Sequence, residues 1–261
     1  MKELVLPAGV SRYSVSKGEK IRILAKENAE TLIEYTAEEE MDLTWEIRVF
    51  PGVRASVFFL NRSEKKTVSS MEAHIAKDAE LSLGYLEWGK DDADFHARVH
   101  LEEDGGSSLM RTAAMAHSKL NYDIETIHHA PHTRGIMKNY GLVTDDTPWT
   151  IVCAGRIEKH ARQSESRQET RILTFAKPET VKVLPILYID ENDVQASHAN
   201  SIGQPDAEAL YYMESRGLSR KEVIGLLAAG YIAPIAEVFE DPAMRAYIRK
   251  MTEKKVREWE S

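Results

Sequence analysis

The sequence predicts a mainly β body that is followed by a small helical segment. From Leu4 to Leu187 the apolar residues mostly alternate with polar ones, which is the period of a strand with one buried face. Turn-forming residues interrupt this stretch often, and after Gly203 the apolar spacing becomes helical. The 261 residues suffice for one large domain with a small appendage. We therefore expect a β domain over residues 1–203 and a helical domain over residues 204–261.

The strands of the β body are clearest where every second residue is apolar. Two such segments contain Leu43, Trp45, Ile47 and Val49, and Phe95, Ala97, Val99 and Leu101. Turn signals stand at Pro51-Gly52, residues 61–63, residues 104–106 and residues 145–148. A sandwich, a barrel and a β-solenoid all satisfy this pattern. No exact repeat selects the solenoid, so the pattern alone leaves the architecture open.

The first of three predicted helices begins near Pro205, a residue suited to a first helical position. Asp206 and Glu208 place negative charge at the positive end of its dipole. Gly217, directly after Arg216, is a natural terminator. The first helix is therefore expected to end at about residue 216.

The second predicted helix begins with a capping box, in which Ser219 and Glu222 satisfy each other's free amides. Its apolar residues follow at helical spacing: Val223, Leu226, Leu227 and Tyr231. A third helix begins near Pro242 and carries Met244, Tyr247, Ile248 and Met251 on one side. Together the three helices predict a small bundle after the β domain.

The composition argues against several classes of partner. The formal net charge of -8 disfavours nucleic acid. The basic cluster of residues 254–257 is flanked by Glu253, Glu258 and Glu260, as on a solvated helix face. No apolar run reaches 18 residues, and residues 1–7 lack the pattern of a secretory signal. We therefore expect a cytoplasmic protein with neither a nucleic-acid nor a membrane partner.

The catalytic motifs of common enzyme classes are absent from the sequence. There is no phosphate loop, dinucleotide fingerprint, His-Glu-x-x-His helix or Gly-x-Ser-x-Gly elbow. Cys153 is the only cysteine, so one chain can build neither a disulfide nor a site made wholly of thiolates. Any dependence on ATP is therefore expected to come from a partner.

An ordered set of segments near the C-terminus resembles the SufB/SufD family of iron-sulfur cluster assembly scaffolds. The segments are residues 184–189, then Asp193-Val194-Gln195-Ala196-Ser197-His198, Gly203-Gln204, and residues 208–218 with their final Ser-Arg-Gly-Leu. Weaker similarity covers residues 127–135 and 153–157. The resemblance extends over roughly residues 120–235.

The resemblance implies a right-handed parallel β-helix whose C-terminal helical domain docks a SufC-like ABC-type ATPase. It also implies a non-catalytic scaffold that pairs through its β-helix with a SufB-like subunit or with itself, forming a dimer. A nascent iron-sulfur cluster is expected to be held transiently near that junction. Strand-like sequence begins almost at once, so the chain resembles a short form that lacks the family's N-terminal helical region.

His198 is the candidate ligand for metal and cluster, because it matches the histidine of the family's Cys-Ser-His motif. The alternative is that His198 only bonds neighbouring backbone in a turn before the helices. Ala196 stands where many relatives have the cysteine, and it has no electron pair to donate. This departure favours a supporting, SufD-like role.

The remaining cysteine and histidines have plainer interpretations. Alternation places Cys153 among buried small hydrophobes. His128 and His129 are adjacent in a strand and so point to opposite faces. His129 with His132, or His117 with either, could bind a metal, but surface and turn histidines are the favoured interpretation.

The helical segment offers candidate partner-binding residues for the ATPase, since interfaces favour aromatic and arginine anchors. They are Tyr211, Tyr212, Arg216, Leu226, Leu227 and Tyr231. Most are expected in the core of the bundle, with one face of residues 219–230 free for the partner.

Two alternative functions stay open from the sequence. The chain is either a structural or regulatory partner of the ATPase with no cluster-binding role, which the missing cysteine motivates, or a carbohydrate-active β-helix enzyme. The enzyme would need paired carboxylates such as Asp91, Asp92 or Glu102 as acid and base.

Overall fold

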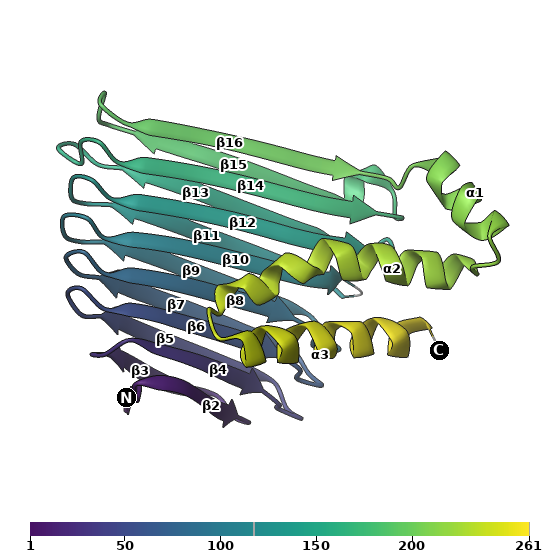
Figure 1. The fold of residues 1–261 in the computed structure, drawn as a ribbon, viewed down its shortest axis with the longest axis horizontal. Coiled ribbons are helices and arrows are strands. Elements are labelled where there is room, and N and C mark those ends of the chain that lie inside the picture. Colours follow the sequence, from purple (N-terminus) through teal and green to yellow (C-terminus); the bar gives the residue numbers. More distant parts are fainter. Residues whose placement is uncertain (117, 261) are drawn as a thin grey trace.

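The chain forms two parallel β-sheets of eight strands each in the computed structural model, which describes residues 1–116 and 118–260 (Figure 1). Sheet A contains β1 Lys2–Val5, β3 Glu19–Ala25, β5 Met41–Val49, β7 Thr67–Ile75, β9 Ala93–Leu101, β11 Leu120–His128, β13 Trp149–Ile157 and β15 Val181–Ile189. Sheet B contains β2 Gly9–Val15, β4 Ala29–Tyr35, β6 Arg54–Asn61, β8 Glu80–Glu87, β10 Ser107–Ala116, β12 Arg134–Val143, β14 Glu165–Thr174 and β16 Gln195–Gly203.

The chain passes alternately through the two sheets, so each coil consists of one strand of sheet A and the following strand of sheet B. Neighbouring strands within each sheet are parallel. Each strand pairs in register with the corresponding strand of the next coil. The architecture expected from the family resemblance, a parallel β-helix, is confirmed. Thr67 pairs with Ala93 but Trp149 pairs with Val181, so the coils lengthen along the chain. This lengthening explains why the sequence has no exact repeat.

The main core lies between the two sheets and is built from the alternate residues that point inward. Trp45, Ile47 and Val49 of β5 are buried there, as the alternation predicts. Aromatic rings also pack against one another inside the solenoid. The ring centroids of Tyr85 and Phe95 lie 3.9 Å apart and those of Trp45 and Phe59 lie 4.9 Å apart. Pairs of this kind add to the stabilisation from burial alone.

Helices cover the outer face of sheet B and leave the outer face of sheet A open (Figure 1). The helical elements are α1 Ala207–Ser215, α2 Arg220–Ile232, η2 Ala233–Val238 and α3 Pro242–Glu260, with η1 Pro178–Thr180 earlier in the chain. Phe239 stacks on Phe58 of β6 with ring centroids 5.4 Å apart, and Ile232 and Ile248 are fully buried beside it. The predicted separate bundle is therefore replaced by a second core that α2, η2 and α3 share with sheet B.

This second core explains why β6 and β8 are apolar on both faces. Phe59 points between the sheets, whereas Phe58 and Leu60 point outward to the helices. The end of β16 at Gly203 coincides with the expected boundary after residue 203. Because the helices share a core with sheet B, the division of the chain into two domains stays a prediction.

The helix ends follow the predicted chemistry. Asp206 accepts a hydrogen bond from the Glu208 amide at the start of α1, and Gly217 follows its last residues with a φ of 95°. In α2 the Ser219 hydroxyl accepts from the Glu222 amide at 3.3 Å. The Glu222 carboxylate accepts from the Ser219 amide at 2.6 Å, which completes the capping box.

The last helix returns to the first coils of the solenoid. The Arg12 guanidinium lies 4.0 Å from the centre of the Tyr247 ring, and the Tyr247 hydroxyl donates to Glu34 at 3.2 Å. The Asp241 amide donates to Glu30 at 3.1 Å. The helical segment thus ties both ends of the solenoid together along one face.

Glu87 is a carboxylate buried inside the solenoid, and it makes stability depend on pH. Asn61, the Tyr85 hydroxyl and the Gly89 amide donate to it at 2.7–2.9 Å, but burial prevails and raises its pKa to about 6. The folded pKa lies above the unfolded value of 4.5, so folding favours the protonated form. Its contribution, about 2 kcal/mol, is complete below pH 4.5 and is lost as the pH rises through 6.

We expect the unmodified chain to lose about 2 kcal/mol of unfolding free energy relative to Glu87→Gln between pH 4.5 and pH 7, since glutamine does not titrate. Urea unfolding at the two pH values measures this difference. Glu80→Gln, which removes an exposed carboxylate from the same strand, is the control. Parallel pH profiles for the unmodified chain and Glu87→Gln would contradict the assignment.

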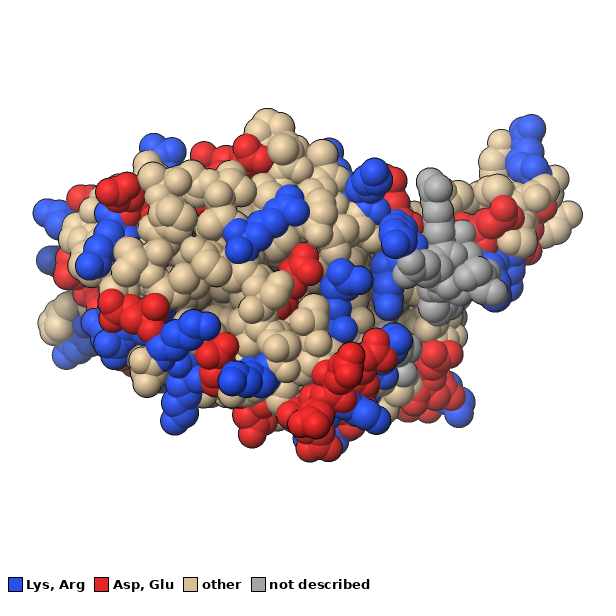
Figure 2. Space-filling model, turned by 90° about the horizontal axis from the view of Figure 1, so that it is seen from below, with Lys and Arg blue, Asp and Glu red and all other residues tan. Residues whose placement is uncertain are grey.

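Charges of both signs are interspersed on the side of the molecule that faces the first coil (Figure 2). A single basic field of the kind that nucleic acid requires is not visible on that face. Among residues 1–116 and 118–260, no helix is long and apolar enough to cross a membrane.

Candidate functional site at the last coil

The last coil, β15 and β16, leaves the edge of both sheets open. Among residues 1–116 and 118–260, β15 pairs only with β13 and β16 only with β14, so each presents one row of unpaired backbone groups (Figure 1). Eight of the nine residues of β16 are exposed. Open strand edges are templates for pairing with another chain.

His198 faces the inside of the solenoid at this open end. In the parallel register Gln168 pairs with His198 and Ser166 pairs with Ala196. Ser166 and Gln168 are buried between the sheets, and paired residues of parallel strands point to the same face. His198 and Ala196 therefore lie on the continuation of the interior, where no further coil covers them.

The environment of His198 differs from the turn that the alternative interpretation assumed. The residue lies in the middle of β16, and its imidazole has no hydrogen-bond partner among the described residues. The described chain also holds no group of three or more metal-ligating side chains. One imidazole is thus exposed at the open end of the solenoid.

Apolar side chains surround the open end on both strands. Leu184, Tyr188 and Ile189 of β15 are 51%, 43% and 37% exposed, and Ile202 of β16 is 40% exposed. The Arg156 guanidinium lies 4.4 Å from the centre of the Tyr188 ring. Large apolar side chains beside unpaired strand edges are typical of a protein interface.

Polar side chains line the interior directly beneath the last coil. The Gln168 amide donates to the Ile186 carbonyl at 2.8 Å, which joins β14 to β15 across the inside. Within residues 1–116 and 118–260, the Gln168 Oε1 and Ser166 Oγ atoms are buried without a hydrogen-bond partner. Ser166 lies so close to Gly155 that a Cβ on this glycine would meet its Oγ at 2.3 Å. Residue 155 therefore has to be glycine for the two sheets to approach.

Cys153 lies in the same coil as Gln168 and is buried, as the alternation predicts. Burial raises the pKa of its thiol to about 12. The thiol contacts Asn139 Nδ2 and Met137 Sδ at 3.7 Å each. With this pKa the thiol of Cys153 is protonated at neutral pH. Because cysteine sulfur binds metal or attacks sulfur as the thiolate, this buried thiol is suited to neither role.

The other histidines are separated by the fold. His128 is fully buried, burial lowers its pKa to about 4, and its Nδ1 lies 2.8 Å from the Thr133 hydroxyl. His129 points to the opposite, outer face, as predicted. His132 pairs with Asp104 at 2.7 Å, and that hydrogen bond raises the pKa of His132. No contact joins His129 to His132 in the described chain, and His117 lies outside the described residues.

The candidate partner-binding residues lie on α1, which extends beyond the end of the sheets, on the residue that follows it, and on α2 (Figure 1). Tyr211 is 74% exposed and Tyr212 57%, contrary to the expectation that most candidates lie in a bundle core. Leu226 is 58% exposed and belongs to residues 219–230, of which one face was expected to be free. Arg216 donates to the Tyr212 hydroxyl at 3.0 Å. The remaining two candidates, Leu227 and Tyr231, are partly buried against the second core.

The carboxylates of the alternative enzyme lie at opposite ends of one strand. Asp91 and Asp92 directly precede β9, whereas Glu102 directly follows it. The nine residues of β9 span roughly 30 Å, while acid and base carboxylates of glycosidases lie within about 10 Å. Asp91 and Asp92 themselves accept backbone hydrogen bonds from Asp92 and Lys119. This geometry offers no acid and base pair.

Sequence reasoning missed the exposed apolar edge of the last coil. The signal was present in residues 183–189, where apolar residues follow one another without alternation. Such a run is typical of a strand covered on both faces. In this chain β15 is covered by neither a helix nor a further strand of the described residues, so its apolar surface is available to a partner.

These features define a class of protein: a parallel β-helix with an open last coil and a C-terminal helical segment that packs on the outer face of one sheet. The family model described as SUF system FeS cluster assembly, SufBD core domain, matches residues 13–231. The chain belongs to this family of iron-sulfur cluster assembly proteins.

Curated proteins of known name agree with this assignment. The iron-sulfur cluster assembly protein SufD of Bacillus subtilis is 28% identical over 180 residues, 68% of this chain and 41% of that protein. Protein ABCI7, chloroplastic, of Arabidopsis thaliana is 23% identical over 242 residues, 88% of this chain and 51% of that protein. SufD of Escherichia coli is 22% identical over 149 residues, 56% of this chain and 35% of that protein. The chain thus spans about half or less of these relatives.

Proposed function

We propose that this chain is a scaffold subunit of an iron-sulfur cluster assembly complex, with a supporting, SufD-like role. The observation that carries the proposal is the open last coil, where the family histidine, His198, faces the continuation of the solenoid interior. In the proposed complex the chain pairs through this coil and binds an ABC-type ATPase through its helices. The nascent cluster is cargo at the junction, and the chain performs no turnover of its own.

Pairing through the last coil is supported by two independent properties of that coil. Its backbone edges are unpaired on both sheets, and its apolar residues, including Leu184 and Ile202, are exposed. The partner is a second β-helix subunit, either a SufB-like chain or another copy of this chain. Pairing would bring side chains of the partner next to His198.

ATPase binding through the helices is supported by the exposure of Tyr211, Tyr212 and Leu226. Exposed aromatic and leucine side chains on a projecting helix fit a partner's groove. A chain truncated after Gly203 is a poor test of this role, because truncation uncovers the second core on sheet B. Point substitutions on α1 and α2 leave that core intact.

The chemical role proposed for His198 predicts a loss of cargo when the imidazole is removed. In a complex co-expressed with its partners and purified without oxygen, we expect His198→Ala to lower iron and sulfide to about a tenth. Ala196 supplies no ligand beside it, so the loss should not be compensated from this chain. Iron and sulfide assays on complexes of equal subunit composition measure the effect.

The matched control is His96→Ala, which removes an exposed histidine from the outer face of sheet A. His96→Ala should leave iron and sulfide unchanged. If His198→Ala also leaves them unchanged while the complex still assembles, the chain is a structural or regulatory partner of the ATPase. That outcome would favour the second candidate function, which the alanine at residue 196 motivates.

A further inference from the structure

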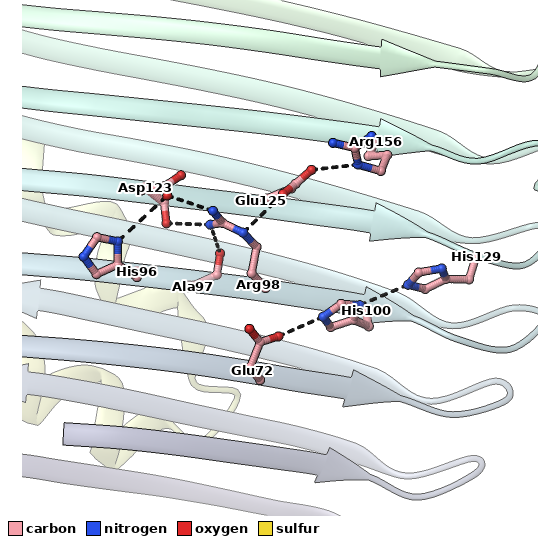
Figure 3. Close-up of polar contacts among 9 residues, drawn as sticks. All are labelled: Glu72, His96, Ala97, Arg98, His100, Asp123, Glu125, His129 and Arg156. Carbon is pink, nitrogen blue, oxygen red and sulfur yellow. Dashed lines mark hydrogen bonds and ion pairs between the residues drawn. The ribbon is translucent and has the colours of Figure 1, made fainter. Parts of the chain in front are cut away.

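A row of imidazoles and carboxylates crosses the open outer face of sheet A. His100 is the second-last residue of β9, and His129 directly follows β11 (Figure 3). The His100 Nδ1 and His129 Nε2 atoms lie 3.0 Å apart. Each ring is held by a carboxylate from a further strand or loop: His100 Nε2 lies 2.8 Å from Glu72, and His129 Nδ1 lies 2.9 Å from Glu158.

The two rings meet edge to edge in nearly one plane. Their planes differ by 7°, and their centroids lie 5.3 Å apart, with 3.0 Å of that separation between the two nitrogens. The facing nitrogens therefore lie close to the line that joins the ring centres. The lone pairs of ring nitrogens lie in the ring plane, so the nitrogens of His100 and His129 are directed at each other.

The carboxylates determine what these facing nitrogens can carry. Ionised Glu72 and Glu158 only accept hydrogen bonds, so the protons of the neutral rings belong on His100 Nε2 and His129 Nδ1. That tautomer leaves His100 Nδ1 and His129 Nε2 as two bare acceptors 3.0 Å apart. Such a pair repels unless a cation, either a proton or a metal ion, is bound by both.

His74 extends the row by one more coil. It pairs with His100 in the register of β7 and β9, and the two ring centroids lie 5.1 Å apart. Its Nδ1 lies 2.7 Å from Glu102. The three carboxylates of this row, Glu72, Glu102 and Glu158, thus favour positive charge on this face.

We propose that His100 and His129 bind a divalent transition-metal ion of the kind that prefers imidazole, such as Zn²⁺, Ni²⁺ or Cu²⁺. The ligands are His100 Nδ1 and His129 Nε2, and Glu72 and Glu158 orient the rings from behind, as carboxylates do in natural metal sites. A small rotation of either ring would direct both lone pairs at one ion. The side chains of His100 and His129 are 21% and 32% exposed, so an ion can reach them from solvent.

The described chain contains no cluster of three or more ligands, so the remaining positions of the ion are open to water. An ion at this site would sit on the outer face of sheet A, which carries none of the described helices. The inference rests on the geometry of this face and not on the proposed role in cluster assembly.

Titration calorimetry of the full chain with Ni²⁺ at pH 8 tests the site. We expect one ion per chain, and at least about tenfold weaker binding for His100→Ala and for His129→Ala. Glu72→Gln should weaken binding about tenfold while keeping both ligands. His96→Ala, on the same strand and the same face as His100, is the matched control and should bind like the unmodified chain.

Electron paramagnetic resonance of the Cu²⁺ complex provides a second readout. Two coordinated nitrogens in the unmodified chain and fewer in His100→Ala would support the site. Equal binding by the unmodified chain and His100→Ala, or no binding at all, would overturn it.

Discussion

Lysine in place of Ile202 is expected to separate the paired subunits. Ile202 is an inward-facing residue of the last strand and is 40% exposed in the single chain, so the substitution is compatible with folding. In a paired complex the ammonium group would be buried against a second β-helix without a counter-charge. We expect pairing to weaken at least about 100-fold, which is about 3 kcal/mol. Sedimentation velocity or light scattering over a concentration series measures the shift.

The matched control for this substitution lies at the other end of the solenoid. Val10 of β2 is also an edge residue and is 47% exposed. Val10→Lys should leave pairing unchanged. If both variants dissociate equally, a charge on either edge of the solenoid weakens pairing and the effect is not specific to the last coil. If Ile202→Lys pairs like the unmodified chain, the subunit junction lies elsewhere.

Loss of the exposed helical anchors is expected to abolish ATPase binding. Tyr211 of α1 and Leu226 of α2 are 74% and 58% exposed, so their removal costs the fold little. Central anchors of an interface each contribute about 2 kcal/mol or more. The double variant Tyr211→Ala with Leu226→Ala should therefore bind the ATPase at least about 100-fold more weakly. Surface plasmon resonance with the immobilised ATPase measures the affinity.

Phe50→Ala is the control for the helical anchors, because Phe50 is 38% exposed and lies between β5 and β6. It should bind the ATPase like the unmodified chain. If the double variant retains full affinity while its melting temperature is unchanged, the ATPase docks on another surface of the chain.

Much of the fold could be predicted from local patterns. The alternation in residues 43–49 and 95–101 predicted strands with one face in the core, and both are confirmed. The capping box of Ser219 and Glu222 is likewise a local feature and is confirmed. The apolar run around Phe58 is different, because its outer face is buried by the helical segment, including Phe239, about 180 residues later in the chain. Local periodicity carries no information on such a contact.

The candidate site was predictable only in part, for the same reason. The family motif identified His198, but its orientation follows from the pairing with Gln168, a property of the long-range register. Most of the candidate partner-binding residues were expected in a bundle core, yet Tyr211 and Tyr212 of α1 are exposed. His100 and His129 are 29 residues apart, and only the coil length brings them together. Coil length varies along this solenoid, so no fixed spacing in the sequence predicts that contact.

Native mass spectrometry of the complex isolated from its own cell tests the central claim most directly. The proposed scaffold predicts an assembly with two β-helix subunits, at least one of them this chain, together with an ABC-type ATPase. The same preparation from cells that carry Ile202→Lys should contain the ATPase with a single β-helix subunit. Recovery of the unmodified chain as a monomer with neither partner would contradict a scaffold role.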